Sequence, residues 1–172
     1  MNLSALTLPA RSTRSAGDPY LKFDLGRQTP AVFSMRHVQE ALILPTRRLT
    51  PMPNMPAPIL GLTNRRSRIS WVVDLPQLLG LSALDSNTQQ HTLILVQVGV
   101  VSISFAVQQV EGITRLQPAD IQAPQGQAMS SLLPYLRGCI LPQQEQKQEV
   151  LLVLDPEAIA QSALFQGNTP LN

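Results

Sequence analysis

The sequence is poor in the residues that most often carry chemistry. Among its 172 residues there is one cysteine, Cys139, and there are two histidines, His37 and His91. A single cysteine rules out an internal disulfide and a cysteine metal cage, and it indicates a reducing compartment. The histidines lie far apart in the chain, and no cluster of carboxylates beside either one completes a set of metal ligands. We therefore expect neither a metal nor a cofactor.

Signatures of the common enzyme classes are missing too. No GxGxxG, GxxxxGKS/T or GxSxG pattern occurs, so dinucleotide sites, P-loops and nucleophile elbows are not indicated. Cys139 could serve as a nucleophile with a histidine, but its neighbours match no cysteine-enzyme signature, and a buried structural thiol is the simpler interpretation. Asp74 precedes a short helical pattern, and a helix cap explains it better than a catalytic carboxylate does. We expect a protein that is not an enzyme and has no catalytic residues.

Long apolar runs are also missing. The longest apolar stretch, residues 93–107, is interrupted by Gln97, Gly99, Ser102 and Ser104, which makes it too polar to span a membrane. The amino terminus has no basic region ahead of an apolar segment, and this argues against a signal peptide. We expect a cytoplasmic protein without direct membrane insertion.

The charge balance is close to neutral. Thirteen basic residues face eleven acidic ones, for a net charge of +2, and this field is too weak to attract nucleic acid by itself. Nearly all the cations are arginine, which favours specific ion pairs over diffuse attraction to phosphate. With 44% apolar but only 4% aromatic residues, the chain can bury a mainly aliphatic core for one domain or two small subdomains.

The apolar pattern is that of many short strands and few helices. Alternation with period two predicts strands over residues 20–25, 31–35, 39–44, 59–63, 68–74, 91–98, 101–107, 110–116, 135–141 and 150–154. Asp74 and Asp155 are expected to cap short helices over residues 75–80 and 155–165. Because strands do not alternate with long helices, a mainly β fold of barrels or a sandwich is predicted.

The segments between and around these elements also carry signals. Residues 45–58 hold five prolines, which predicts an extended connector because proline fixes φ and donates no backbone hydrogen bond. Residues 1–18 lack periodicity and are expected to form a flexible tail. We expect one folded unit over residues 19–165 and a second tail over residues 166–172.

Arginine is concentrated on both sides of the proline connector. The five residues are Arg47, Arg48, Arg65, Arg66 and Arg68. Five arginines on a small barrel could bind RNA. Proteins that read single-stranded RNA also need exposed aromatic side chains for base stacking, and the one aromatic nearby, Trp71, lies in a strand that could bury it. RNA binding is therefore the alternative to a protein-docking role.

A longer pattern begins at Ile59, where the chain reads ILGLTNRRSRISWVVDL. This stretch resembles the hallmark IxGvxNLRGxVxPVvDL of the CheW-like adaptors of bacterial chemotaxis. Further segments resemble the family in the same order: YLKFDLG from Tyr20, VQEA from Val38, the spaced prolines Pro53 and Pro56, VQQVEGITRL from Val107, YLRGCI from Tyr135 and VLLVLD from Val150. The resemblance covers nearly all of residues 19–165.

The resemblance implies a fold and a function. The expected fold is two small five-stranded SH3-like β-barrels that share a hydrophobic core. The expected function is non-enzymatic: an adaptor that couples methyl-accepting chemoreceptors to a CheA-type histidine kinase in taxis or motility control. The receptor tip would dock between the barrels, and the kinase regulatory domain on an end of the second barrel. A response regulator is a further possible partner, and the protein would be recruited to membrane receptor assemblies.

Five positions carry over from the family as the receptor groove and its supporting turn. They are Val38, Glu40, Gly61, Asn64 and Arg66. We expect Asn64 to shape the turn, because asparagine tolerates a positive φ and can hydrogen-bond its own backbone. We expect the planar fork of Arg66 to bind a carboxylate bidentately, with Glu40 as its partner across the barrels or with a receptor.

The sequence also departs from the family pattern. Arg65 replaces an apolar residue and Ser67 replaces a glycine, which would strain the backbone if φ is positive there. The other departures are Trp71 for proline, Pro76 for arginine and Gln108 for aspartate. A divergent adaptor in a specialised motility pathway, such as pilus-driven phototaxis, would explain them, and a composition rich in glutamine and poor in lysine is consistent with a cyanobacterial source.

Overall fold

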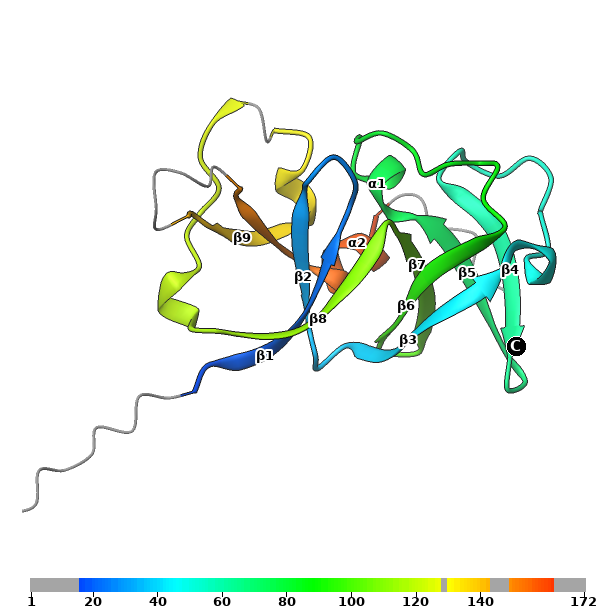
Figure 1. The fold of residues 1–172 in the computed structure, drawn as a ribbon, viewed down its shortest axis with the longest axis horizontal. Coiled ribbons are helices and arrows are strands. Elements are labelled where there is room, and N and C mark those ends of the chain that lie inside the picture. The colour runs from blue at the N-terminus through cyan, green and yellow to red at the C-terminus, as the bar shows by residue number, and fades with distance from the viewer. Residues whose placement is uncertain (1–15, 128–129, 143–148, 163–172) are drawn as a thin grey trace, which may run out of the picture.

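Two curled five-stranded sheets lie side by side along the long axis of the molecule (Figure 1). The structure is a computed structural model that describes residues 16–127, 130–142 and 149–162. The first sheet has the strand order β8-β1-β2-β10-β9, and the second has the order β3-β6-β7-β5-β4. Each sheet forms a half-barrel, so the predicted mainly β fold of two five-stranded barrels is confirmed.

The elements agree closely with the sequence pattern. The strands are β1 (Asp18–Asp24), β2 (Pro30–Ser34), β3 (Val38–Pro45), β4 (Ile59–Arg65), β5 (Arg68–Asp74), β6 (Gln90–Val98), β7 (Val101–Val107), β8 (Gln109–Leu116), β9 (Leu136–Ile140) and β10 (Leu151–Leu154). The helices are α1 (Leu75–Leu78) and α2 (Pro156–Ala160), with 3-10 turns at η1 (Thr46–Arg48), η2 (Pro118–Asp120) and η4 (Leu133–Tyr135).

The remaining differences from prediction are at the ends of elements. β1 begins at Asp18, within the segment predicted as an N-terminal tail. The predicted helix over residues 155–165 is shorter than expected, since α2 ends at Ala160 with Gln161 as its C-cap. Residues 1–15, residues 163–165 and the predicted C-terminal tail over residues 166–172 lie outside the described residues.

The second half-barrel is one continuous insertion in the first. Its strands β3 to β7 span residues 38–107, whereas the first sheet is assembled from strands on both sides of that segment. The first sheet is completed by parallel pairing of β10 with β2, and in the second sheet β5 pairs in parallel with β7. Residues 35–37, between β2 and β3, are therefore one of the two chain crossings between the barrels.

A shared hydrophobic core joins the two sheets. The ring of Phe33 on β2 packs against Phe23 on β1, with centroids 5.0 Å apart, and against Phe105 on β7, with centroids 5.4 Å apart. Aliphatic side chains surround this row of rings, as the composition predicts. Because Phe105 belongs to the second sheet, the aromatic row connects the two barrels.

Strand β5 of the second sheet is buried on both of its faces from Ser70 to Asp74. On β5, Trp71 and Val73 face the shared core, while Val72 between them faces the interior of the second barrel. Alternation of side chains along a strand produces this arrangement. Val72 meets Leu93 and Ala106 there, and this small apolar cluster fills one end of the barrel interior.

The proline connector closes the second barrel at that end. After η1 the chain runs extended, and Thr50 forms an isolated bridge with Leu62 of β4, with both backbone N–H···O distances at 2.8 Å. Gly61 lies directly under this crossing and has φ +148°. The predicted extended connector is thus confirmed, and it adds a short pairing at the edge of the sheet.

Both short helices begin at an aspartate, as predicted. Asp74, which is 2% exposed, accepts hydrogen bonds from the backbone N–H of Gln77 and of Leu84, each at 2.9 Å. Asp155 accepts from the N–H of Glu157 at 3.0 Å and of Ala158 at 3.3 Å. Capping satisfies N–H groups that the first turn leaves without partners.

Candidate functional site

The arginine-rich stretch forms a tight hairpin between β4 and β5. Arg65 pairs with Arg68, and the two residues between them, Arg66 and Ser67, have φ of 49° and 63°. Two consecutive positive φ values in a two-residue connection define a type I′ turn, which matches the twist of a hairpin. Ser67 therefore occupies a left-handed conformation that favours glycine, and the predicted strain at this position is confirmed.

The prediction for Asn64 is wrong. This residue lies within β4, opposite Ile69 of β5, and does not have a positive φ. The turn begins two residues later because the ladder continues to the Arg65–Arg68 pair. On the next strand, Ile69 is 55% exposed and does not join Trp71 in the core. The strand extends past the shared core at its arginine end.

Glu40 pairs with Arg65, not with Arg66 as predicted. The Nε of Arg65 donates to Oε2 of Glu40 at 3.0 Å, and its Nη2 donates to Oε1, so the contact is bidentate. Side chains alternate along β4, and this places Arg65 on the same face as the buried Thr63, whereas Arg66 lies in the turn. The pair joins β3 to β4, the two edges of the second sheet.

A double-mutant cycle should show that Glu40 is coupled energetically to Arg65 and not to Arg66. Combining Glu40→Ala with Arg65→Ala should show a coupling of about 1 kcal/mol in the free energy of unfolding, because both groups are partly exposed. Combining Glu40→Ala with Arg66→Ala should show almost none. Urea denaturation of the six proteins measures both couplings. A larger coupling to Arg66 than to Arg65 would mean that Glu40 pairs with Arg66 in solution.

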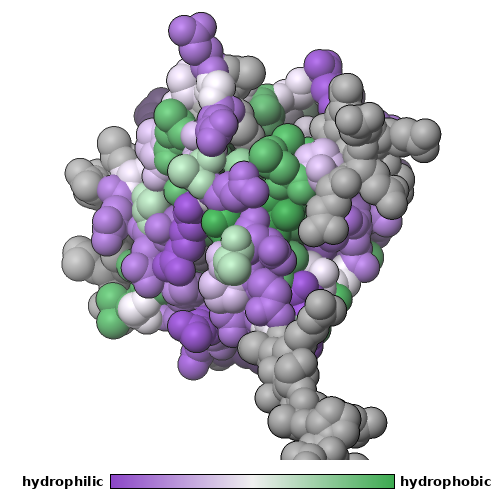
Figure 2. Space-filling view, turned by 90° about the vertical axis from the view of Figure 1, so that its left-hand side faces the viewer, coloured by the Kyte–Doolittle hydropathy of each residue, from purple (hydrophilic) through white to green (hydrophobic). Residues whose placement is uncertain are grey.

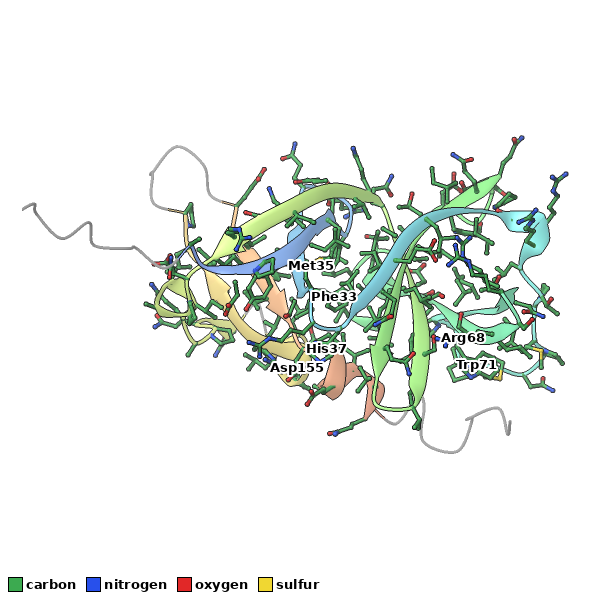
Figure 3. All side chains as sticks on the ribbon, turned by 90° about the horizontal axis from the view of Figure 1, so that it is seen from below. Phe33, Met35, His37, Arg68, Trp71 and Asp155 are labelled. Carbon is green, nitrogen blue, oxygen red and sulfur yellow. The ribbon has the colours of Figure 1, made fainter. Side chains whose placement is uncertain are left out.

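The arginines gather around an open cavity in the second barrel. The cavity has a volume of about 570 Å³, and residues of β3 to β7 together with the Arg66 turn line it. Glu40, Arg65, Arg66 and Arg68 are among its lining residues. Figure 3 shows Arg68 and Trp71 on the second barrel, away from His37 and Asp155. The cavity that these arginines line thus lies within the second barrel, and the predicted docking surface between the barrels stays a prediction.

The structure separates the five predicted site residues. Glu40 and Arg66 line the same cavity. Gly61 lies deeper in β4 beneath the connector, and Asn64 is exposed. Val38 packs against the shared core directly after the chain crosses from the first barrel. The two residues that sequence reasoning missed are Arg65, which holds Glu40, and Arg68, which pairs across the hairpin.

A second cavity of about 500 Å³ lies beside the chain crossing at residues 35–37. His37 lines it, and its Nε2 lies 3.4 Å from Oε1 of Glu157 on α2. Arg137 also lines the cavity, and its Nε lies 3.7 Å from Oδ2 of Asp155. Sequence reasoning did not find this cluster because its members come from separate segments that no single motif contains.

The end of the molecule formed by the first barrel has a mixed surface. Figure 2 shows hydrophobic patches there that polar side chains interrupt. Leu133 and Leu141, on either side of β9, are among the exposed large hydrophobic residues.

The titratable residues that sequence analysis weighed for chemistry occupy structural positions. Cys139 is buried in β9, as expected for a structural thiol. Burial lowers the pKa of His91, and the nearby carboxylate of Asp74 opposes that shift. Among the described residues no three His, Cys, Asp or Glu side chains form a potential metal site. Within the same residues, no helix has the length and apolar character needed to cross a membrane.

The buried position of Trp71 argues against the RNA-binding alternative. Trp71 is 8% exposed and packs in the shared core, so its ring is not available for stacking on bases. Arg47 and Arg48, in η1, are not among the residues that line the cavity at the arginine hairpin. The five arginines therefore do not form a single binding surface in this cavity.

Two half-barrels surround one core, and a partly polar cavity opens in the second of them. The chain matches the family model of the CheW-like domain over residues 19–164. The protein therefore belongs to the CheW-like family.

Two relatives support this assignment. The chemotaxis protein CheW of Rhizobium meliloti (strain 1021) is 36% identical over 73 residues, which are 42% of this chain and 46% of that protein. The match thus spans about half the length of the curated relative. The crystal structure of the scaffolding protein TtCheW from Thermoanaerobacter tengcongensis has a TM-score of 0.67, with 81% of this chain and 89% of that chain covered. At 16% identity, this likeness shows the fold.

Proposed function

We propose that this protein is a non-enzymatic signalling adaptor that couples methyl-accepting chemoreceptors to a CheA-type histidine kinase. The match to the CheW-like family over residues 19–164 carries the proposal. The relatives named above are a chemotaxis protein and a scaffolding protein. An adaptor acts by binding alone, so it needs accessible surfaces rather than catalytic groups.

Arg66 is the residue we assign to direct contact with the receptor tip. Glu40 is held by Arg65, and Arg66 forms no ion pair with any described residue. Its exposed guanidinium can therefore bind a carboxylate of a receptor helix bidentately. We assign supporting roles to Glu40 and Gly61, which hold the edges of the barrel that carry this turn. Val38 and Asn64 complete the proposed surface.

We assign the kinase regulatory domain to the β6–β7 turn, which lies at the same end of the second barrel as the Arg66 turn that we assign to the receptor. Because β5 and β7 run parallel, the turns before them lie at the same end of the sheet. Val100, at the tip of the β6–β7 turn, is 97% exposed, and Ile69 near the other turn is also exposed. Exposed apolar residues beside cations are typical of protein-docking surfaces.

The cellular setting follows from the same proposal. The protein acts in the cytoplasm and is recruited to receptor assemblies at the membrane. We further propose a specialised branch of taxis, of which pilus-driven phototaxis is one candidate, and the departures at Arg65 and Ser67 support this proposal. A response regulator is a further candidate partner, and affinity capture followed by identification of the bound proteins would reveal it.

Calorimetric titration tests the proposal. The purified chain should bind the regulatory domain of a CheA-type kinase from the same organism with micromolar or tighter affinity, and it should also bind the tip of a receptor. Arg66→Ala should weaken receptor binding about ten-fold, since one charge-assisted bidentate contact is lost. Arg47→Ala, which removes an exposed arginine from η1, is the matched control and should change neither affinity.

Two results would contradict the proposal. If no CheA-type kinase or receptor tip from the organism binds, the fold serves some other partner. If Arg47→Ala weakens receptor binding as much as Arg66→Ala does, the arginines act only through overall charge. A salt series separates these cases, because a general charge effect weakens steadily as ionic strength rises.

A further inference from the structure

The interior of the second barrel changes from apolar to charged along its length. Its floor is the cluster of Leu44, Val72, Leu93 and Ala106, which is closed to solvent. Above the floor, the cavity of about 570 Å³ is lined on one side by leucines and on the other by hydroxyl groups. The charged residues of the arginine hairpin form its rim. A small barrel of this kind is normally filled by its own side chains.

The hydroxyl residues Thr63, Ser70 and Ser104 line one side of the cavity, here called the hydroxyl wall. Their small size explains why side chains do not fill the cavity. Ser70 and Ser104 are 5% and 2% exposed, and Thr63 lies opposite Ser70 in the ladder. These positions face inward on buried strands, where valine or isoleucine would be usual. Small hydroxyl residues leave the space above the floor open.

The same wall offers a hydrogen-bond donor to the cavity. The Oγ atoms of Ser70 and Ser104 lie 2.8 Å apart, so one hydroxyl donates to the other. The accepting hydroxyl keeps its own hydrogen, because each serine carries one donor and two acceptor sites. A polar group that enters the cavity can therefore accept a hydrogen bond from a buried residue.

The rim carries more positive than negative charge. Three arginines line the cavity together with one carboxylate, that of Glu40, among the described lining residues. Arg65 is engaged by Glu40, whereas Arg66 and Arg68 form no ion pair with any described residue. The excess of guanidinium groups favours an anion at the mouth of the cavity.

We propose that this interior is a binding site for a small aliphatic carboxylate. The hydrocarbon chain lies against Leu42 and Leu95, and the carboxylate lies toward the rim, where Arg68 and the hydroxyl wall donate to it. The cavity volume falls within the range of about 300–1,000 Å³ that is usual for small-molecule sites. The Arg66 turn that we assign to docking forms part of the rim of this cavity, but a carboxylate site in the barrel interior does not depend on the proposed adaptor function.

Titration of the full-length protein with hexanoate, followed by backbone amide NMR, tests the site. Hexanol, which has the same chain length and no charge, is the matched ligand. At constant ionic strength hexanoate should produce saturable shifts at Thr63, Ser70 and Ser104, with an affinity about ten-fold or more above that of hexanol. Equal affinity of the two ligands, shifts that map elsewhere, or no saturation would overturn the proposal.

Two variants locate the bound molecule. Arg68→Gln should reduce hexanoate affinity to that of hexanol, whereas the control Arg47→Gln should leave it unchanged. Ser104→Leu should abolish binding of both ligands because it fills the cavity. Since added bulk can also destabilise a packed barrel, its folding is checked by thermal denaturation, and Arg68→Gln on the exposed rim decides the question if Ser104→Leu does not fold. Hexanoate binding to Arg68→Gln at the unchanged affinity would overturn the assignment.

Discussion

Replacement of Gly61 by alanine should destabilise the protein by about 3–5 kcal/mol, the largest effect we expect from any single methyl group. A Cβ at this position would collide with the backbone carbonyl of Thr50, and φ of +148° is unfavourable for any residue with a side chain. Backbone strain costs about 1–3 kcal/mol. Loss of the two hydrogen bonds between Thr50 and Leu62 adds about 1 kcal/mol for each bond.

Replacement of Gly112 by alanine separates the cost of backbone strain from the cost of the collision with Thr50. Gly112 on β8 also has a positive φ, +127°, but a Cβ there meets no atom within 4 Å. It should therefore cost only the backbone term of about 1–3 kcal/mol. Chemical denaturation of both variants measures the difference. If Gly112→Ala destabilises the protein as much as Gly61→Ala does, the contact with Thr50 contributes nothing.

Replacement of Asp74 by alanine should destabilise the protein by about 3–4 kcal/mol. The carboxylate accepts from two backbone N–H groups, those of Gln77 and Leu84, and it is 2% exposed. Loss of the helix cap on Gln77 costs about 1 kcal/mol, and loss of the charge-assisted hydrogen bond from the N–H of Leu84 costs about 2–3 kcal/mol more. The stability of Asp74→Asn should lie between that of the unchanged protein and that of Asp74→Ala, since its amide has a single acceptor oxygen.

The C-terminal helix offers the control for this prediction. Asp155 caps α2 in the same way, accepting from Glu157 and Ala158, but the bond from Glu157 is exposed to solvent. Asp155→Ala should therefore cost only about 1 kcal/mol, because water can replace the lost acceptor. The midpoints and slopes of urea denaturation for Asp74→Ala and Asp155→Ala measure the contrast. Similar losses would show that burial does not strengthen the Asp74 cap.

Local signals predicted the elements well. Alternation of apolar residues located the strands within two residues of their ends, and the prolines located the connector. Asp74 and Asp155 were recognisable as caps because a capping residue acts on N–H groups two or three positions ahead of it. The order of the family motifs along residues 19–164 then indicated the fold, which the family match confirms. All of these signals depend on neighbours in the sequence.

The arrangement of side chains at the arginine hairpin could not be predicted in this way. A shift of one residue along a strand moves a side chain to the opposite face, so the position of the type I′ turn decides that Arg65, and not Arg66, meets Glu40. The family pattern gave no guide, because Arg65 stands where relatives have an apolar residue. Ile69 is exposed for a similar reason, since the shared core ends before the strand does.

The sequence by itself therefore determined the class of fold, the strands and helices, the caps and the strained turn, because each depends on the chemistry of a few consecutive residues. The tertiary structure alone decided which arginine holds Glu40, where the arginine cavity opens and which hydroxyl groups line it. Those features arise when the second sheet curls and brings its two edge strands, β3 and β4, toward each other. Curling and strand register are set by the packing of the whole sheet against the shared core, and no local pattern encodes them.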